Sequence, residues 1–110
     1  MAKGAKKHLT LYSKKVPLLN NVLTFANMGL VPAGAHKNRA FFKRLTRVST
    51  DIERVLSDLM FDPQTSGGLV ICLKKQDAPT CVEQMEKKGI NARIVGEVSK
   101  ESSTGFLDII

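Results

Sequence analysis

Hydrophobic and polar positions follow two rhythms along this chain, and the two-residue rhythm predicts strands. Segment 8–13 alternates, with leucines on one face and a threonine and a tyrosine on the other, as in a strand with one covered face. Segment 69–73 is apolar throughout, which is typical of a strand buried on both faces. Segments 92–98 and 105–110 are expected to complete a sheet of about four strands.

The helical rhythm, in which apolar residues recur every three or four positions, marks the remaining segments. In the second half, Thr50 and Glu53 form a capping-box pattern at a helix start. A later helix has Asp77 as its cap, Pro79 in its first turn and Gly89 just beyond its end. The helical ranges are 18–30, 35–48 (helical or mixed), 50–59 and 77–89. This order of elements predicts an α/β layered domain.

A polar, glycine-containing loop joins the third of these helices to the apolar strand. It reads Phe61-Asp62-Pro63-Gln64-Thr65-Ser66-Gly67-Gly68. Its glycines permit backbone angles that other residues resist, and successive N–H groups in such a turn can form an anion-binding concavity. It is not a P-loop, because it precedes a strand and lacks Gly-Lys-Ser/Thr. The alternative is a rigid connector whose hydroxyls satisfy nearby backbone groups.

Charge is distributed unevenly along the 110 residues, which suffice for a single domain. The net charge is +7, and residues 1–50 carry ten Lys or Arg and no Asp or Glu. Residues 51–110 carry seven basic and ten acidic residues. The first half is therefore expected to face something anionic, such as nucleic acid, a phosphorylated ligand or an acidic partner. A solvated basic surface is the alternative.

The cysteines and the first residues of the chain bear on where in the cell the protein is expected. Cys72 and Cys81 lack the paired spacing of a zinc site, and we expect reduced, buried thiols in a cytoplasmic protein. Residues 1–7 lack the apolar core of a signal peptide, and no apolar run is long enough to span a membrane. A short helical stretch leading directly into a strand suggests that the sequence begins inside a longer protein.

Three short motifs occur in order along the chain. They are Val31-Pro32-Ala33-Gly34 with Asn38-Arg39, then Asp62 to Leu69, then Ile94-Val95-Gly96-Glu97-Val98. Together with Val16-Pro17-Leu18-Leu19 they resemble the C-terminal part of selenophosphate synthetase (selenide, water dikinase), and the second motif is highly specific. The resemblance covers essentially the whole chain. It implies the fold of the C-terminal half of aminoimidazole ribonucleotide synthetase, a mixed sheet layered with helices.

The resemblance also implies a function. Enzymes of this family use ATP, magnesium and selenide to make selenophosphate, releasing AMP and orthophosphate, and selenophosphate supplies selenium for selenocysteine and modified tRNA bases. Residues 1–110 would form one domain of such an enzyme, without its N-terminal ATP-binding domain. The partners implied are that N-terminal domain and, for the full enzyme, a second copy in a homodimer. No cofactor is expected to bind tightly to this piece alone.

Several functional residues of the family have no counterpart here. The family's catalytic cysteine or selenocysteine, its essential lysine and its magnesium-binding aspartates lie in segments that nothing in this sequence matches. Cys72 lies in an apolar run without activating neighbours, so it does not inherit the nucleophile's role. We therefore expect no catalytic residue in this chain and no activity from it alone.

The resemblance places the candidate site at the polar loop. Backbone and hydroxyl groups of the loop are expected to donate to phosphate oxygens in an interdomain cleft, with interdomain packing as the alternative. A basic stretch is the second candidate, since a guanidinium grips phosphate with two donors, and the alternative is a solvated surface. Asp62 either holds magnesium or caps the turn. The candidates in the loop are Thr65, Ser66, Gly67 and Gly68, and those in the basic stretch are Lys37, Asn38 and Arg39. His8 and His36 are expected to lack partners.

A basic nucleic-acid-binding module is the rival interpretation. Phe41 and Phe42 among cations favour it, but they also fit a core stripe, and no RNA-binding or helix-turn-helix signature is evident. Nucleic acid is therefore not expected as a partner. A third interpretation is a folding and dimer-support domain without ligand contact. Steeply salt-dependent retention of an oligonucleotide would separate the rival from a synthetase domain.

Overall fold

A computed structural model describes residues 1–101 and 103–110. Its elements are the helices α1 (Ala2–Ala5), α2 (Val22–Asn27), α3 (Ala33–Phe42), α4 (Arg54–Leu59) and α5 (Ala78–Lys87), the 3-10 turn η1 (Ser13–Lys15), and the strands β1 (Lys7–Leu11), β2 (Thr46–Val48), β3 (Gly96–Glu101) and β4 (Phe106–Ile109). Within the described residues, the strands form one mixed sheet in the order β2-β4-β1-β3. The predicted α/β fold with a mixed sheet of about four strands is therefore confirmed.

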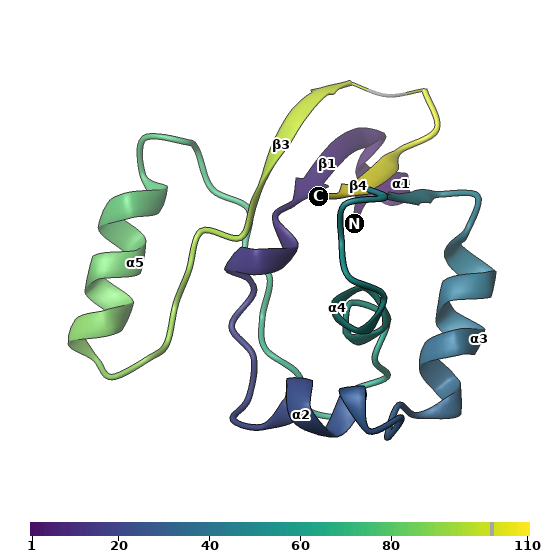
Figure 1. Cartoon of the computed structure of the whole chain (residues 1–110). Coiled ribbons are helices and arrows are strands. Elements are labelled where there is room, and N and C mark those ends of the chain that lie inside the picture. Colours follow the sequence, from purple (N-terminus) through teal and green to yellow (C-terminus); the bar gives the residue numbers. More distant parts are fainter. Residues whose placement is uncertain (102) are drawn as a thin grey trace.

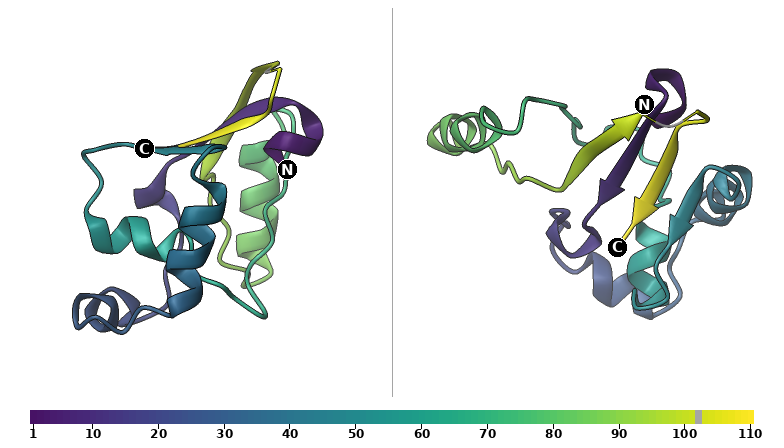
Figure 2. Two further views of the ribbon diagram at one scale, coloured as in Figure 1. Left: turned by 90° about the vertical axis from the view of Figure 1, so that its right-hand side faces the viewer. Right: turned by 90° about the horizontal axis from the view of Figure 1, so that it is seen from above.

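The sheet has one covered face and one open face. Strand β4 pairs in parallel with β1 and β2, and β1 pairs antiparallel with β3. Helices α2, α3 and α4 lie together on one side of the sheet, as Figure 1 shows, and from above the strands lie in front of them (Figure 2). Ile109 on β4 is only 1% exposed. Because side chains alternate along a strand, its neighbour Asp108 lies on the opposite face.

The hydrophobic core is small and sits where α2, α3 and α4 meet the sheet. Its buried apolar residues are Ala26, Ala35, Phe61 and Ile109. Helix α4 contacts both α2 and α3. Helix α5, in contrast, has no buried residue and lies apart from the other helices (Figure 1). The core therefore holds together the part of the fold that carries the loop after α4.

Several local predictions are confirmed. Segment 8–13 supplies β1, and segments 92–98 and 105–110 supply β3 and β4 with shifted bounds. The mixed segment 35–48 contains most of α3 together with β2. Helix α5 begins after Asp77, has proline in its first turn, and is followed by Gly89 with φ 74°, although the Asp77 side chain makes no capping hydrogen bond.

Three local predictions are wrong. Segment 69–73 is not a strand, and Leu69 is 90% exposed. An apolar run forms a strand only where a neighbouring strand pairs with its backbone, and no backbone hydrogen bond joins residues 69–73 to another described residue. Cys72 in this run is consequently exposed and Cys81 half-buried. The capping box does not form either, because α4 begins after Glu53, which makes no side-chain cap.

Candidate functional site

The polar loop begins with a stem whose first residue is buried. Phe61 directly follows α4 and is 9% exposed. The N–H groups of Phe61 and Asp62 donate to Asp58 O and Leu59 O, at 3.1 and 3.2 Å. Pro63 follows, which rules out helical continuation at Asp62. The stem, residues 61–63, is therefore fixed to the C-terminal end of α4.

Helix α3 packs against this stem through residues of the first recognised motif. A Cβ at Gly34 would lie 2.7 Å from Pro63 Cγ, so only glycine allows this approach. One turn further, Asn38 Nδ2 donates to the Phe61 carbonyl oxygen at 3.0 Å. Residues four apart lie on one helix face, which is why both reach the stem. The structure thus brings Asn38 to the loop.

Arg39 ties α3 to α4 beside the same stem. Its Nη2 donates to Ser57 Oγ at 2.7 Å and lies 2.7 Å from Asp58 Oδ1. Its guanidinium carbon lies 5.2 Å from the centroid of the Phe61 ring, within the range of a cation–π contact. Its Nε is buried and has no hydrogen-bond partner within the described residues. Arg39 is therefore engaged inside the fold.

The rest of the loop forms an exposed tip, residues 64–68. Thr65, Ser66, Gly67 and Gly68 are all exposed, and no backbone hydrogen bond joins residues 63–73 to another described residue. Neither Gly67 nor Gly68 has a positive φ, so neither uses the left-handed backbone region that glycine permits. A Cβ at Gly68 would meet nothing within 4 Å. Nothing inside the described fold requires glycine at this position.

Asp62 is the middle residue of the stem. Its Oδ2 is 3.5 Å from Gln64 Nε2, and its Oδ1 is buried with no hydrogen-bond partner in the described part of the chain. The described residues contain no group of three His, Cys, Asp or Glu placed to hold a metal. Magnesium prefers six oxygen ligands, so these residues do not form a magnesium site by themselves.

Lys37 lies on α3 but is not brought to the loop by any contact. It is exposed, and no ion pair or hydrogen bond of its side chain is recorded within residues 1–101 and 103–110. Of the seven candidate residues, the structure therefore places two against the stem, four in the tip and one on the open surface of α3.

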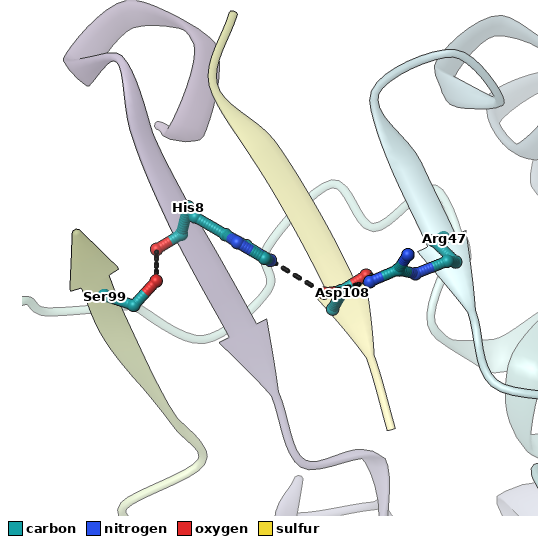
Figure 3. A network of polar contacts seen from close by, with 4 residues as sticks. All are labelled: His8, Arg47, Ser99 and Asp108. Atoms are coloured by element: carbon teal, nitrogen blue, oxygen red, sulfur yellow. Dashed lines mark hydrogen bonds and ion pairs between the residues drawn. The ribbon is translucent and has the colours of Figure 1, made fainter. Parts of the chain in front are cut away.

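A polar network that the sequence analysis missed lies on the open face of the sheet. Asp108 on β4 accepts hydrogen bonds from Arg47 Nε and Nη2, both at 2.8 Å, and lies 2.7 Å from His8 Nε2. Figure 3 shows these side chains reaching across β1, β4 and β2. The expectation that His8 lacks a partner is wrong, because the pairing of β1 with β4 brings His8 to Asp108, 100 positions away. The sequence does not show this strand order.

The network sets the charge of its central carboxyl. The hydrogen bond from Arg47 holds the pKa of Asp108 below its usual value, assisted by the hydrogen bond to His8 and opposed by burial. The same contact raises the pKa of Arg47. A depression of about 370 Å³ lies beside this network and is bordered by Ser49 and Thr50. It does not include the glycine loop, so loop and depression are separate features.

Fold and loop together define an α/β domain with one open sheet face and a polar loop braced at its stem. Comparison with curated proteins finds selenide, water dikinases from Clostridium botulinum (strain Eklund 17B / Type B), Clostridioides difficile and Campylobacter jejuni (strain NCTC 11168). These relatives are 36%, 38% and 40% identical to this chain over 98, 99 and 97 residues, which is 88–89% of its length. The chain spans about 28% of the length of these relatives.

The family itself is also identified. A family described as AIR synthase related protein, C-terminal domain, matches residues 1–108, and the chain belongs to it. The resemblance to selenophosphate synthetase inferred from the three motifs is thereby confirmed. These matches support that interpretation and not the nucleic-acid-binding one. No helix in the described residues is long and apolar enough to cross a membrane.

Proposed function

We propose that this chain is the C-terminal domain of a selenophosphate synthetase (selenide, water dikinase). The enzyme would use ATP and magnesium to transfer phosphate to selenide and to water, releasing AMP and orthophosphate. The proposal is carried by the match to three proteins of that name along nearly nine-tenths of this chain. Because the match spans under a third of those relatives, the chain alone is proposed to be inactive.

Within that enzyme, we assign the tip of the loop to phosphate contact. Phosphoryl transfer depends mostly on positioning and on donors directed at charged oxygens. The hydroxyls of Thr65 and Ser66 and the N–H groups of Gly67 and Gly68 are exposed and unpaired within the described fold. The absence of an internal need for glycine at position 68 supports close approach of something from outside. Lys37, exposed on α3, is the second candidate for phosphate contact, with a solvated surface as the alternative.

The partner of this domain is proposed to be the remainder of the longer polypeptide. The apolar strip, residues 69–73, directly follows the tip, and its leucines, valine and isoleucine are 47–90% exposed. Exposed apolar surface next to a site is typical of an interdomain contact. The full enzyme would be a cytoplasmic homodimer whose subunit contacts lie mainly outside this domain. The two free cysteines fit a reducing compartment.

A chimera tests the proposal. The segment of the Clostridioides difficile relative that matches this chain is replaced by residues 1–110, and AMP release is measured with and without selenide. We expect selenide-dependent AMP release, and a loss of it in the same chimera carrying Gly68→Val, whose side chain would block approach to the tip. A folded chimera without selenide-dependent release, beside an active unmodified relative, would contradict the assignment of the domain.

A further inference from the structure

The stem of the loop is held by contacts with α3 and α4, whereas the tip is not. This difference indicates that the two parts of the loop have different roles. Phe61, the first residue of the stem, is buried, and the stem is contacted by α3 and α4. The tip is exposed and has no backbone hydrogen bond to another described residue. Any side chain that fixes the stem therefore decides where the tip is presented.

Arg39 is one such side chain. Its partners Ser57 and Asp58 are 3% and 8% exposed, and Asp58 Oδ1 lies 2.7 Å from Arg39 Nη2. A guanidinium whose charge is compensated by a buried carboxylate binds a further anion poorly, because that carboxylate repels it. The guanidinium also lies over the ring of Phe61. Arg39 thus restrains the Phe61 side chain.

Asn38 acts on the same residue through the backbone. Its amide donates to the Phe61 carbonyl oxygen at 3.0 Å. A buried carbonyl that loses its donor is unfavourable, so this contact holds the peptide group that leads into Asp62. Arg39 and Asn38 therefore restrain one residue from two directions, ring and carbonyl.

We propose that Asn38 and Arg39 are positioning residues, which hold Phe61 so that the tip is presented to phosphate while they touch no phosphate themselves. What the tip binds rests on the proposed function, whereas the restraint on Phe61 does not. The experiment therefore has one arm without ligand and one with orthophosphate.

The first arm measures amide hydrogen exchange of the free chain. The variants are Asn38→Asp, which keeps the size but removes the donor, and Arg39→Lys, which keeps the charge but loses the planar fork. We expect exchange of the Phe61 and Asp62 amides, which are hydrogen-bonded to α4, to accelerate roughly tenfold. The amides of Ser13 and Ile110, which donate to Ile110 O and to Leu11 O at the end of the sheet, should be unchanged.

Lys43→Ala is the matched control, since Lys43 is an exposed cation at the end of the same helix. It should alter neither set of amides. Equal acceleration of stem and sheet amides in the Asn38 and Arg39 variants would mean a general loss of stability. Unchanged stem amides would mean that neither side chain restrains Phe61. Either result overturns the proposal.

The second arm titrates the chains with orthophosphate and follows the amide resonances of residues 65–68. We expect saturable shifts in the unmodified chain and roughly tenfold weaker binding in both variants, because misplaced donors lose most of their effect. Weaker binding in Arg39→Lys with unchanged stem exchange would show direct phosphate contact and overturn the proposal. If phosphate moves no tip resonance but stem exchange accelerates, the tip assignment fails and the restraint on Phe61 stands.

Discussion

Replacing Gly34 by alanine tests the packing of α3 on the stem, because two effects of this substitution have opposite signs. Alanine is favoured over glycine inside a helix by up to about 1 kcal/mol. Against this, a Cβ at position 34 would lie 2.7 Å from Pro63 Cγ and 3.4 Å from Pro63 Cβ. Carbon atoms in contact prefer about 3.5–4.0 Å. The helix and the stem must therefore move apart by roughly 1 Å.

The stem cannot absorb this movement easily. The ring of Pro63 is bonded to its own backbone nitrogen and cannot rotate away. The displacement is therefore transmitted to the neighbouring hydrogen bond from Asn38 to the Phe61 carbonyl, which is 3.0 Å long. Overpacking of this kind typically destabilises by about 1–3 kcal/mol. Because this exceeds the gain in helix propensity, we expect Gly34→Ala to lower the free energy of unfolding by about 1 kcal/mol.

Urea unfolding followed by circular dichroism measures the effect. Gly4→Ala in α1 is the matched control, because a Cβ there would meet nothing within 4 Å; it should be neutral or slightly stabilising. Pro63→Ala removes the ring, and combined with Gly34→Ala it should restore most of the lost stability. A Gly34→Ala chain as stable as the unmodified one, or a loss that Pro63→Ala leaves unchanged, would refute the reasoning.

Three further predictions concern the sheet, the core and the apolar strip. The pKa of Asp108 is lowered from its ordinary value of 3.8, so the ionised carboxylate stabilises the fold at any pH above 3.8, and this stabilisation is lost as the pH falls through the lowered pKa. The acid unfolding profile of Asp108→Asn should lack this loss of stability, and a profile identical to that of the unmodified chain would disprove the prediction. Ile109→Ala should lose about 2–4 kcal/mol in thermal or urea unfolding, whereas Ile110→Ala, at a 51% exposed position, should stay near neutral; equal losses would argue against a core at Ile109. Ile71→Thr should reduce the concentration-dependent self-association of the chain measured by light scattering. Unchanged scattering would show that the apolar strip does not cause association.

Sequence patterns predicted those elements whose identity is decided locally. The alternation at 8–13 and the proline and glycine around α5 each require only neighbouring residues, and both predictions are confirmed. The strand predicted at 69–73 fails because pairing depends on another part of the chain. Its apolar residues satisfy the pattern of a buried strand, but the described sheet consists of β2, β4, β1 and β3, and none of them pairs with this segment.

The candidate site shows the same limit. The loop was recognisable from its own residues, and so were Asn38 and Arg39, but their roles depend on contacts across 18 to 23 positions of sequence. The buried partners Ser57 and Asp58 lie on α4, and nothing in the local pattern distinguishes them from surface residues of a helix. The partnership of His8 with Asp108 spans nearly the whole chain and gives no local signal.

The arrangement explains why two motifs that are separate in sequence occur in one chain. The residues of 31–39 and those of 61–63 form one packing unit, since Gly34 contacts Pro63 and Asn38 contacts Phe61. Phe61 and Pro63 of the stem thus have an internal reason, whereas Asp62 Oδ1 is buried without a hydrogen-bond partner among the described residues. In the tip, 64–68, Gln64 contacts Asp62 and leaves little room for a Cβ at Gly67, whereas nothing in the described fold requires glycine at position 68. Substitutions in the stem should therefore change stability and binding together, whereas those in the tip should change binding alone, and this contrast separates a ligand-facing loop from a mere connector.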